Sequence, residues 1–260
     1  MEIIVLLKQV PSTESIIEIE ADGKSIKKGD IKWVMNPYDE LAVEEAIRIR
    51  DAQGGSVTIL TAGPDKAAEA IRTALAMGAD KGVLINDPQL DPGNSLAVAA
   101  ALAKAAQGLS FDLIAAGMRA VDDDGYLVGT AVAEALNIPC VSMVIKQEIK
   151  DGAIVCHKTV DGGTAVVESS LPMLFTAQRG LNEPRYASLP GIMKAKKKPI
   201  DTKTLADLGL DVGDFAGCAL HITALNPPPE RKAGRMIAGD SPRAKAAELV
   251  RVLHEEAKVI

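Results

Sequence analysis

The feature that most limits the fold is a regular alternation of short apolar runs with longer helix-forming segments. The apolar runs are residues 2–7, 31–35, 56–61, 82–86 and 111–115, and the helical segments are 41–50, 65–77, 94–106 and about 126–136. Helical crossovers of this length join neighbouring parallel strands. The alternation therefore predicts an α/β fold with a doubly wound, mainly parallel sheet, whose ligand site lies at the carboxyl ends of the strands.

The apolar period changes at Val141. Three β-rich segments follow, at 141–150, 153–160 and 164–169, separated by Asp151-Gly152 and by Asp161-Gly162-Gly163. Asp-Gly and Gly-Gly pairs are typical of tight hairpin turns. These segments predict an antiparallel ribbon, after which residues 173–176 rejoin the main sheet.

Beyond Lys198 the pattern is that of a less compact tail. Residues 204–208 predict one helical turn, and 219–225 predict a strand. Pro227–Pro229 stiffen the link to a final amphipathic helix, which is expected over 242–257 after a cap at Ser241. A tail of this kind is extended enough to lie on another chain.

Composition argues against several classes of function. The chain has 260 residues, a formal net charge of −6 and only 3% aromatic residues, so its core must consist mainly of aliphatic side chains. An acidic chain without an extended basic face argues against nucleic acid as a partner. The first apolar run is interrupted at Lys8, and no later run approaches the length of a membrane span. We expect a cytoplasmic protein that does not insert into a membrane.

The sequence contains no recognisable catalytic or metal-binding motif. Neither a GxGxxG turn nor a GxxxxGK[ST] loop occurs, and Lys8-Gln9-Val10-Pro11 stands after the first strand. The three histidines are isolated, and the three cysteines form no CxxC pair. These patterns disfavour a metal site, an activated nucleophile and a disulfide framework. We expect a protein that is not an enzyme by itself.

Four segments at the ends of predicted strands are candidates for holding a ligand. They are Lys8, Asn36-Pro37-Tyr38-Asp39, Ala62-Gly63-Pro64 and the stretch from Gly117 to Val128. Gly117 and Gly125 permit close backbone approach, and the amides at the start of the helix after Asp124 suit a phosphate. The carboxylates of Asp122–Asp124 also fit ordinary capping of that helix, so ligand binding and capping both remain open here.

Residues 179–200 have the features of an exposed, protruding segment, which we call the hook. Ser188 is placed to cap a short helix, on which Leu189, Ile192 and Met193 share one face. Six basic residues against one acidic residue give the stretch a local charge of +5. Helices under roughly 12 residues are marginal in water, so this one needs packing from its own chain or from a partner. A surface helix with a core-facing stripe and a docking surface are both compatible with the pattern.

The hook sequence LNEPRYASLPGIMKAKKK resembles the recognition loop of the electron transfer flavoprotein β subunit. The blocks MNPYDELAVEEAIRIR, IRTALAMGADKGV, VDDD and VDGGTAVVESSLPMLFT resemble further parts of that subunit. The resemblance covers most of residues 1–200 and continues more loosely to the end. It implies one subunit of a heterodimer that accepts electrons from flavin-dependent dehydrogenases of the acyl-CoA dehydrogenase type and passes them to a downstream acceptor.

The resemblance also implies cofactors and a partner subunit. The α subunit holds most of an FAD, and the β site binds AMP or, in bifurcating members, a second FAD. We expect residues 1–200 to form the nucleotide-binding domain, including the recognition loop at 179–200, and residues 201–260 to form a C-terminal arm on the α subunit. The expected cofactor-binding residues are Leu6, Lys8, Asn36, Pro37, Tyr38, Asp39, Ala62, Gly117, Val121, Asp122, Asp124, Gly125 and Val128. The expected partner-binding residues are Leu189, Ile192, Met193, Arg185 and Lys194, with Leu189 as the apolar anchor.

Two positions depart from the family pattern. Simple members carry a threonine where Val128 stands and an aromatic residue near the flavin where this chain has Thr13. VDDD and MKAKKK resemble simple members, whereas Val128 and Val10-Pro11 are closer to bacterial and bifurcating ones. Backbone amides around Gly125 can hold a phosphate without the hydroxyl, so Val128 does not exclude AMP. We favour AMP, because the acidic cluster Asp122–Asp124 is expected where the extra bulk of a flavin would have to go, and simple members keep it. A free-standing adenine-nucleotide-binding regulatory domain and a nucleotide hydrolase or transferase are competing interpretations, but neither explains the hook.

Overall fold

The computed structural model describes residues 1–91, 93–211, 213–218, 220–229 and 233–260. The chain divides into two compact units, Met1–Ala224 and Leu225–Ile260. The first unit contains the sheets, and the second contains the helix α7 (Pro242–Glu255). Each unit is considered by itself below.

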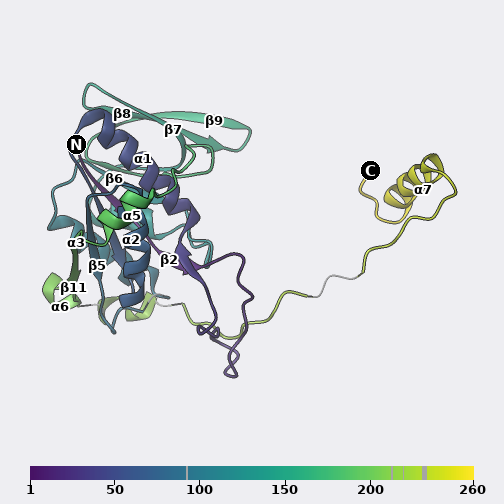
Figure 1. Ribbon diagram of the computed structural model, residues 1–260, viewed down its shortest axis with the longest axis horizontal. Coiled ribbons are helices and arrows are strands. Elements are labelled where there is room, and N and C mark those ends of the chain that lie inside the picture. Colours follow the sequence, from purple (N-terminus) through teal and green to yellow (C-terminus); the bar gives the residue numbers. More distant parts are fainter. Residues whose placement is uncertain (92, 212, 219, 230–232) are drawn as a thin grey trace. The chain divides into compact units, whose positions relative to one another are not determined.

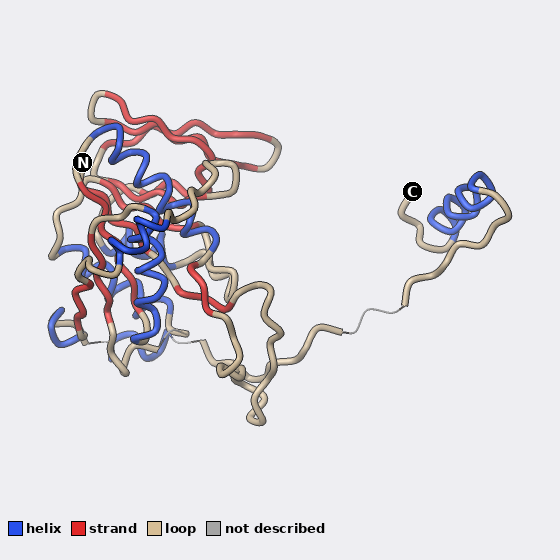
Figure 2. Tube along the Cα trace, in the orientation of Figure 1, coloured by secondary structure: helices blue, strands red, loops and turns tan. Residues whose placement is uncertain are grey.

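A nine-stranded sheet forms the centre of the first unit (Figure 1). In spatial order its strands are β11 (Ile200–Lys203), β5 (Lys81–Ile85), β4 (Ser56–Ala62), β1 (Glu2–Leu6), β6 (Leu113–Gly117), β10 (Met173–Ala177), β7 (Cys140–Lys150), β8 (Ala153–Val160) and β9 (Gly163–Ser170). The pairs from β11 to β7 are parallel, whereas β7, β8 and β9 pair antiparallel and extend the sheet as a ribbon (Figure 2). A separate antiparallel pair is formed by β2 (Gln9–Pro11) and β3 (Trp33–Met35). The predicted mainly parallel sheet with an antiparallel ribbon is confirmed.

Helices cover both faces of the parallel part of the sheet. One face packs against α1 (Pro37–Gln53), α2 (Ala68–Met77) and α5 (Leu189–Ala195), and the other against α3 (Ser95–Gln107), α4 (Val128–Ala135) and α6 (Leu205–Leu208). Short 3₁₀ turns occupy Asp65–Ala67 and Gly213–Cys218. The fold is therefore doubly wound, as the alternation of apolar and helical segments predicts.

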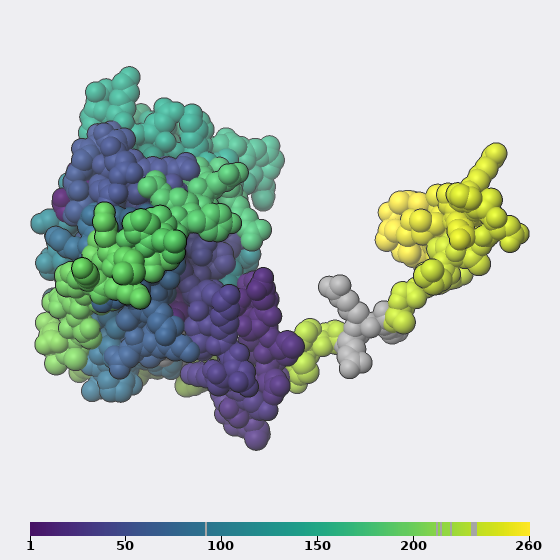
Figure 3. Space-filling model, viewed as in Figure 1, coloured from purple at the N-terminus to yellow at the C-terminus, as the bar shows by residue number. Residues whose placement is uncertain are grey.

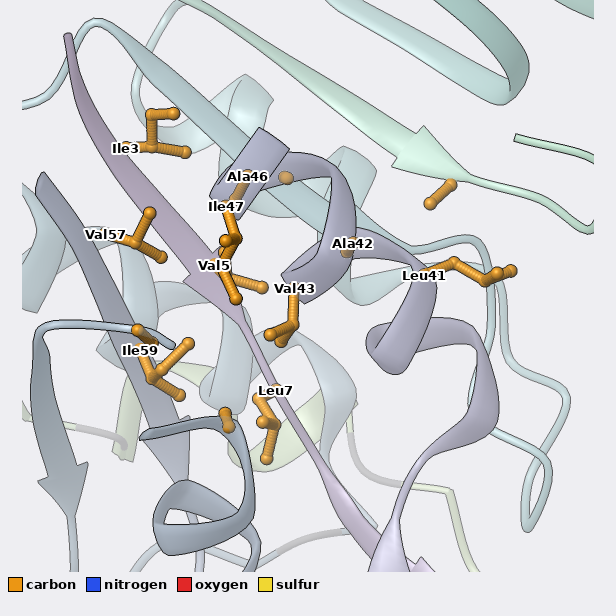
Figure 4. Packing of buried hydrophobic residues seen from close by; sticks show 14 of the residues in the cluster. Ile3, Val5, Leu7, Leu41, Ala42, Val43, Ala46, Ile47, Val57 and Ile59 are labelled. Atoms are coloured by element: carbon orange, nitrogen blue, oxygen red, sulfur yellow. The ribbon is translucent and has the colours of Figure 1, made fainter. Parts of the chain in front are cut away.

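The central strand β1 shows why both faces need cover. Its side chains alternate, so that Ile3 and Val5 lie in the cluster with α1 and α2, while Ile4 and Leu6 lie in the cluster with α3 and α4. Figure 4 shows the first cluster, in which Val5 lies close to Ile47 of α1. A strand that is apolar on both faces is stable only when helices exclude water from each of them.

Two expectations about the chain need correction. Ile200–Lys203 was expected to belong to the tail but pairs in parallel with β5, so the first unit extends beyond residue 200. Residues 220–225 form no strand, and Ala219 lies outside the described residues. Both segments contain β-prone residues, and the difference is that only the first one has a neighbouring strand with which to exchange backbone hydrogen bonds. The 220–225 segment has none within the described residues.

Phe175 offers a test of this core. It lies on β10 between two parallel neighbours and is 0% exposed. Phe175→Ala should lower the free energy of unfolding by about 3–5 kcal/mol, because it leaves a cavity between the sheet and the helices. Val166→Ala is the control, since Val166 is 61% exposed on β9 and should change stability by no more than about 0.5 kcal/mol. Urea denaturation of both variants measures their free energies of unfolding. Equally small decreases for the two variants would contradict the prediction.

Candidate functional site

A cavity of about 340 Å³ opens at the carboxyl ends of the central parallel strands. The strands β1, β4, β5 and β6 each contribute their final region to its wall, at Leu6, Ala62, Ile85 and Gly117. The chain order reverses at β1, because β4 and β5 lie on one side of it and β6 lies on the other. Diverging connections at such a point leave a crevice, which is where open α/β sheets bind ligands. The cavity lies at the position that the strand pattern predicts.

The cavity combines an apolar interior with a polar rim. Apolar side chains come from Leu90, Val98, Leu102, Leu127 and Val128, and polar groups come from Lys8, Asn86, Asp87, Ser95 and Arg119. Small-molecule sites commonly have this character, since apolar walls bury a ring system while a few polar groups fix its orientation.

Asp39 joins the ends of β1 and β6 beneath the cavity. Its buried carboxylate accepts the backbone N–H of Lys8 at 2.7 Å and that of Gly117 at 3.0 Å. Gly117 is required at this contact, because a Cβ there would lie 2.3 Å from Oδ1 of Asp39. Burial raises the pKa of Asp39 to about 7, although the two amide hydrogen bonds act in the opposite direction. The close approach expected at Gly117 is therefore an approach to α1.

Asn36 fixes the loop that follows β6. Its Nδ2 donates to the backbone carbonyl of Arg119 at 2.9 Å, and its Oδ1 accepts the N–H of Val121 at 3.2 Å. These bonds use both ends of the amide, so its side chain makes no capping bond to α1. Asn36 stands at the N-cap position of α1 and accepts the amides of Asp39 and Glu40 through its backbone carbonyl. The side chains of Asn36 and Asp39 hold the loop that forms the cavity wall.

The acidic run Asp122–Asp124 pairs with two cations. Nζ of Lys8 lies 2.9 Å from Asp122 and 2.8 Å from Asp123, and Nη1 of Arg119 lies 2.8 Å from Asp124. Desolvation acts to raise the pKa of Asp123, but its hydrogen bonds with Lys8 and the Gly125 amide hold that pKa below its ordinary value. Helix α4 begins only at Val128, later than predicted, and has no side-chain cap. Capping by these carboxylates is therefore wrong.

The loop between β6 and α4 has an uncommon backbone conformation. Asp124 and Tyr126 have φ values of 49° and 51°, in the left-handed region that few residues other than glycine adopt. The guanidinium of Arg119 lies over the rings of Tyr38 and Tyr126, at 5.2 and 5.5 Å from their centroids. These contacts hold the entry to α4. The first amides of a helix lack intrahelical acceptors, and Val128 lines the cavity, so α4 presents donors suited to an anion.

The cavity brings together most of the predicted cofactor-binding residues. Those that line it are Leu6, Lys8, Asn36, Asp39, Ala62, Gly117, Gly125 and Val128. Those that do not line it are Pro37, Tyr38, Val121, Asp122 and Asp124. Tyr38, Asp122 and Asp124 support its wall through Arg119 and Lys8, as described above. Whether each residue contacts a cofactor stays a prediction.

Sequence reasoning missed the part of the cavity that follows β5. Asn86 and Asp87 lie directly after that strand, and Ser95, Val98 and Leu102 lie on α3. Asn86 and Asp87 could have been predicted from the sequence. Polar residues that follow a predicted parallel strand lie at the same sheet edge as the other candidates. The α3 residues could not have been predicted, because the apolar residues of a helix have the same spacing whether they face a cavity or pack against a sheet.

Metal ligands and membrane spans were sought in the described ranges. There, no group of three or more His, Cys, Asp or Glu side chains is arranged to hold a metal ion. None of the helices in those ranges has both the length and the apolar character needed to cross a membrane.

The hook, residues 179–200, is a second candidate surface (green in Figure 3). Oγ of Ser188 accepts the N–H of Gly191 at 3.1 Å and caps α5 as predicted. Leu189, Ile192 and Met193 are 80%, 40% and 62% exposed. The apolar stripe therefore faces outward, and the interpretation as a core-facing stripe is wrong.

Helix α5 is held tightly against α2. A Cβ on Gly191 would lie 2.5 Å from the carbonyl oxygen of Ala76, so only glycine permits this approach. The guanidinium of Arg72 donates to the carbonyls of Ala195 and Lys198, and the Lys198 ammonium donates to the body of the protein. The Arg72 bonds satisfy carbonyls at and just beyond the end of α5, and the Lys198 bond reaches the carbonyl of Ala79 after α2. The exposed stripe thus has a fixed position on the first unit.

The chain matches known proteins over its whole length. It is 43% identical over 261 residues to the electron transfer flavoprotein subunit beta of Bacillus subtilis, and the alignment covers 100% of both chains. Residues 25–208 match the family described as electron transfer flavoprotein domain. The chain belongs to the electron transfer flavoprotein family, among its β subunits.

Further relatives agree with this membership. An electron transfer flavoprotein subunit beta from Syntrophomonas wolfei is 41% identical, with 100% of this chain and 98% of the relative covered. The caffeyl-CoA reductase-Etf complex subunit CarD of Acetobacterium woodii is 35% identical, with 98% and 99% covered. The predicted resemblance is confirmed. As an electron transfer flavoprotein β subunit, the chain takes part in flavin-based electron transfer as a carrier subunit.

The Asp39 carboxyl makes a testable contribution to stability. Its pKa is about 7 in the folded chain against an ordinary value of 3.8, so the folded state holds this proton more tightly than the unfolded state. The resulting stabilisation is complete below about pH 4 and is lost as pH rises to about 7. We expect the urea midpoint of the wild type to fall relative to that of Asp39→Asn between about pH 5 and pH 7, and to show no further relative change at higher pH. Parallel pH profiles would refute this assignment.

Proposed function

We propose that this chain is the β subunit of a heterodimeric electron transfer flavoprotein that accepts electrons from flavin-dependent dehydrogenases, of the acyl-CoA dehydrogenase type, and passes them to a downstream acceptor. The observation that carries the proposal is the hook. Its leucine is 80% exposed at the tip of a helix that is otherwise anchored to the body. An apolar side chain presented in this way is typical of a docking anchor.

The surroundings of Leu189 fit a protein partner. Met193 is 62% exposed beside it, and a flexible thioether adapts to partners of different shape. Lys194, Lys196 and Lys197 are exposed at the end of α5. These lysines are placed to steer the hook toward acidic surfaces, an effect that increases the association rate more than the affinity.

The second unit supports pairing with an α subunit. Helix α7 has no buried residue, and Leu249 and Val250 on it are 44% and 55% exposed. Within its own unit this apolar stripe has little cover, which favours packing on another chain. We assign the α subunit as that chain, with most of an FAD bound by it. The C-terminal arm predicted at 201–260 thereby includes Leu225–Ile260 as its packing segment.

We assign AMP to the cavity of the β subunit. Its volume of about 340 Å³ is near the lower end of the usual range for small-molecule sites, about 300–1,000 Å³, which suits a mononucleotide better than a dinucleotide. The apolar interior suits the adenine ring. The first amides of α4 suit the phosphate.

A bifurcating subunit with a second FAD is the alternative. The similarity to a subunit of a caffeyl-CoA reductase-Etf complex favours it, as does Val128 in place of a hydroxyl-bearing residue. The ion pairs from Lys8 to Asp122 and Asp123 argue the other way, because they close one side of the site against a larger ligand.

Truncation of the hook anchor tests the docking role. Leu189→Ala should lower the rate of electron transfer from an acyl-CoA dehydrogenase at limiting concentration by about tenfold or more, because a central apolar anchor typically contributes more than about 1 kcal/mol. FAD content and copurification of the two subunits should not change. Stopped-flow reduction of the purified heterodimer measures the effect.

Val166→Ala is the matched control for this experiment. Val166 on β9 is 61% exposed and, unlike Leu189, lies outside both the hook and the C-terminal arm. It should leave transfer from the dehydrogenase unchanged. Equal rates for Leu189→Ala and the wild type at limiting dehydrogenase would refute the docking role.

The nucleotide content of the heterodimer tests the assignment of the cavity. Denaturation should release one FAD and one AMP per heterodimer, whereas two FAD and no AMP would show a bifurcating type. Val128→Thr should strengthen AMP binding by about ten- to 100-fold, because a hydrogen bond to a charged phosphate contributes about 1.5–3 kcal/mol. Chromatography of the released nucleotides and AMP titration of stripped protein provide the measurements.

A further inference from the structure

Glu44 is a charged side chain in an almost fully buried position. It lies within α1 and is 2% exposed. A buried carboxylate is strongly destabilising unless hydrogen bonds and an opposite charge compensate for its lost hydration. The groups that compensate it indicate why a charge stands at this place in the core.

Four donors surround the Glu44 carboxylate. Arg185 supplies three of them, with its backbone N–H and Nε at 3.1 and 2.8 Å from Oε2 and its Nη2 at 3.1 Å from Oε1. Arg48, one turn later on α1, donates its Nε to Oε1 at 2.7 Å. Burial acts to raise the pKa of Glu44, but the hydrogen bonds with Arg185 and Arg48 outweigh it and lower that pKa. The contact is a two-pronged arginine–carboxylate pair, which fixes orientation as well as distance.

The neighbouring Glu45 holds the residues just before Arg185. Nδ2 of Asn182 donates to Oε2 of Glu45 at 2.8 Å. Nη2 of Arg48 donates to the backbone carbonyl of Glu183 at 3.3 Å. We call residues 182–185 the base of the hook. This base is tied to α1 through the buried residues Glu44 and Glu45 and through the exposed Arg48, and it precedes the exposed tip.

The connection between the base and the tip is short and only partly packed. Ala187 packs against the core, whereas Tyr186 is 99% exposed, and α5 begins at Leu189. The direction from which the chain enters α5 is therefore determined by the base on one side and by the contacts of α5 with α2 on the other. A docking segment that is held in its binding orientation loses less conformational entropy on association.

We propose that Glu44 and Arg185 form a positioning pair that orients the hook so that Leu189 can engage the dehydrogenase. This inference rests on the docking role proposed above for Leu189. Arg185 directs Nε and Nη2 to Glu44, and its Nη1 lies 3.6 Å from Asp51. Nε and Nη2 are thus engaged by Glu44, which fixes the plane of the guanidinium on its own chain. Arg185 serves partner binding through Leu189 and makes no essential partner contact itself.

A purely structural role and a direct contact role for the pair lead to different experimental outcomes. If the pair only stabilises the fold, its loss lowers the free energy of unfolding and leaves docking intact. If the arginine contacts the dehydrogenase directly, it contributes to the binding free energy independently of Leu189. Groups that act through one another show non-additive effects, whereas independent groups are additive. A double-mutant cycle with Leu189 therefore separates positioning from both of these roles.

The cycle uses Glu44→Gln, Leu189→Ala and the double variant. Glu44→Gln keeps the size of the side chain and removes its charge. Each variant is purified as the heterodimer with its α subunit, checked for FAD content, and assayed with an acyl-CoA dehydrogenase that reduces the unmodified heterodimer. We expect Glu44→Gln to raise the KM for the heterodimer by about three- to tenfold with little change in kcat, and to have no further effect when combined with Leu189→Ala.

Glu18→Gln is the matched charge control. It also removes one negative charge and breaks an ion pair, since Glu18 lies 2.7 Å from Lys27, but both side chains are exposed. Its KM should equal that of the wild type. This outcome excludes a long-range change in the field of the protein as the cause of the Glu44→Gln effect.

Two results overturn the proposal: an unchanged KM for Glu44→Gln, or an additive effect of Glu44→Gln and Leu189→Ala. If Glu44→Gln does not assemble, Arg185→Gln replaces it in the same cycle, because the Arg185 side chain is 39% exposed. An additive effect of Arg185→Gln then indicates direct partner contact and also overturns the proposal. Wild-type kinetics for Leu189→Ala alone would instead contradict the docking role, so the two failures are distinguishable.

Discussion

Helix α1 holds both candidate surfaces in place through buried carboxylates. Asp39 in its first turn accepts the amide hydrogens at the ends of β1 and β6, and Glu44 and Glu45 accept donors from the hook. These side chains belong to residues that are 5%, 2% and 7% exposed. A carboxylate in such surroundings must be satisfied by hydrogen bonds, so each one fixes a segment that is distant in the sequence against the helix.

This arrangement separates the groups that position each surface from the groups that make contact. The carboxylates that position the cavity and the hook are buried, Asp39 under the loop after β6 and Glu44 under the base of the hook, and Gly191 packs closely against α2. The groups available to other molecules stay accessible, as Leu189 does at the tip. A recognition surface supported in this way needs little ordering on binding, which suits the docking role proposed for the hook.

Much of the fold could be predicted from the sequence because it depends on local patterns. Ser188 and Ser241 cap α5 and α7 as expected, since a cap involves residues within one helical turn. The turn at Asp151-Gly152 has the positive φ values that this pair favours. Strand β11 could not be predicted in the same way, because Ile200–Lys203 becomes a strand only through its pairing with β5.

The sequence by itself determined the class of fold, the sheet edge where the cavity lies and the apolar face that became the tip of the hook. Each of these follows from a residue period or from the order of elements along the chain. Only the tertiary structure decided what the acidic residues do. Asp122–Asp124 look like helix caps but pair with Lys8 and Arg119, and Glu44 looks like half of a surface pair with Arg48 but receives Arg185, 141 residues away. The partner of a carboxylate depends on which segments meet in space, and the residues next to it in the sequence do not determine those contacts.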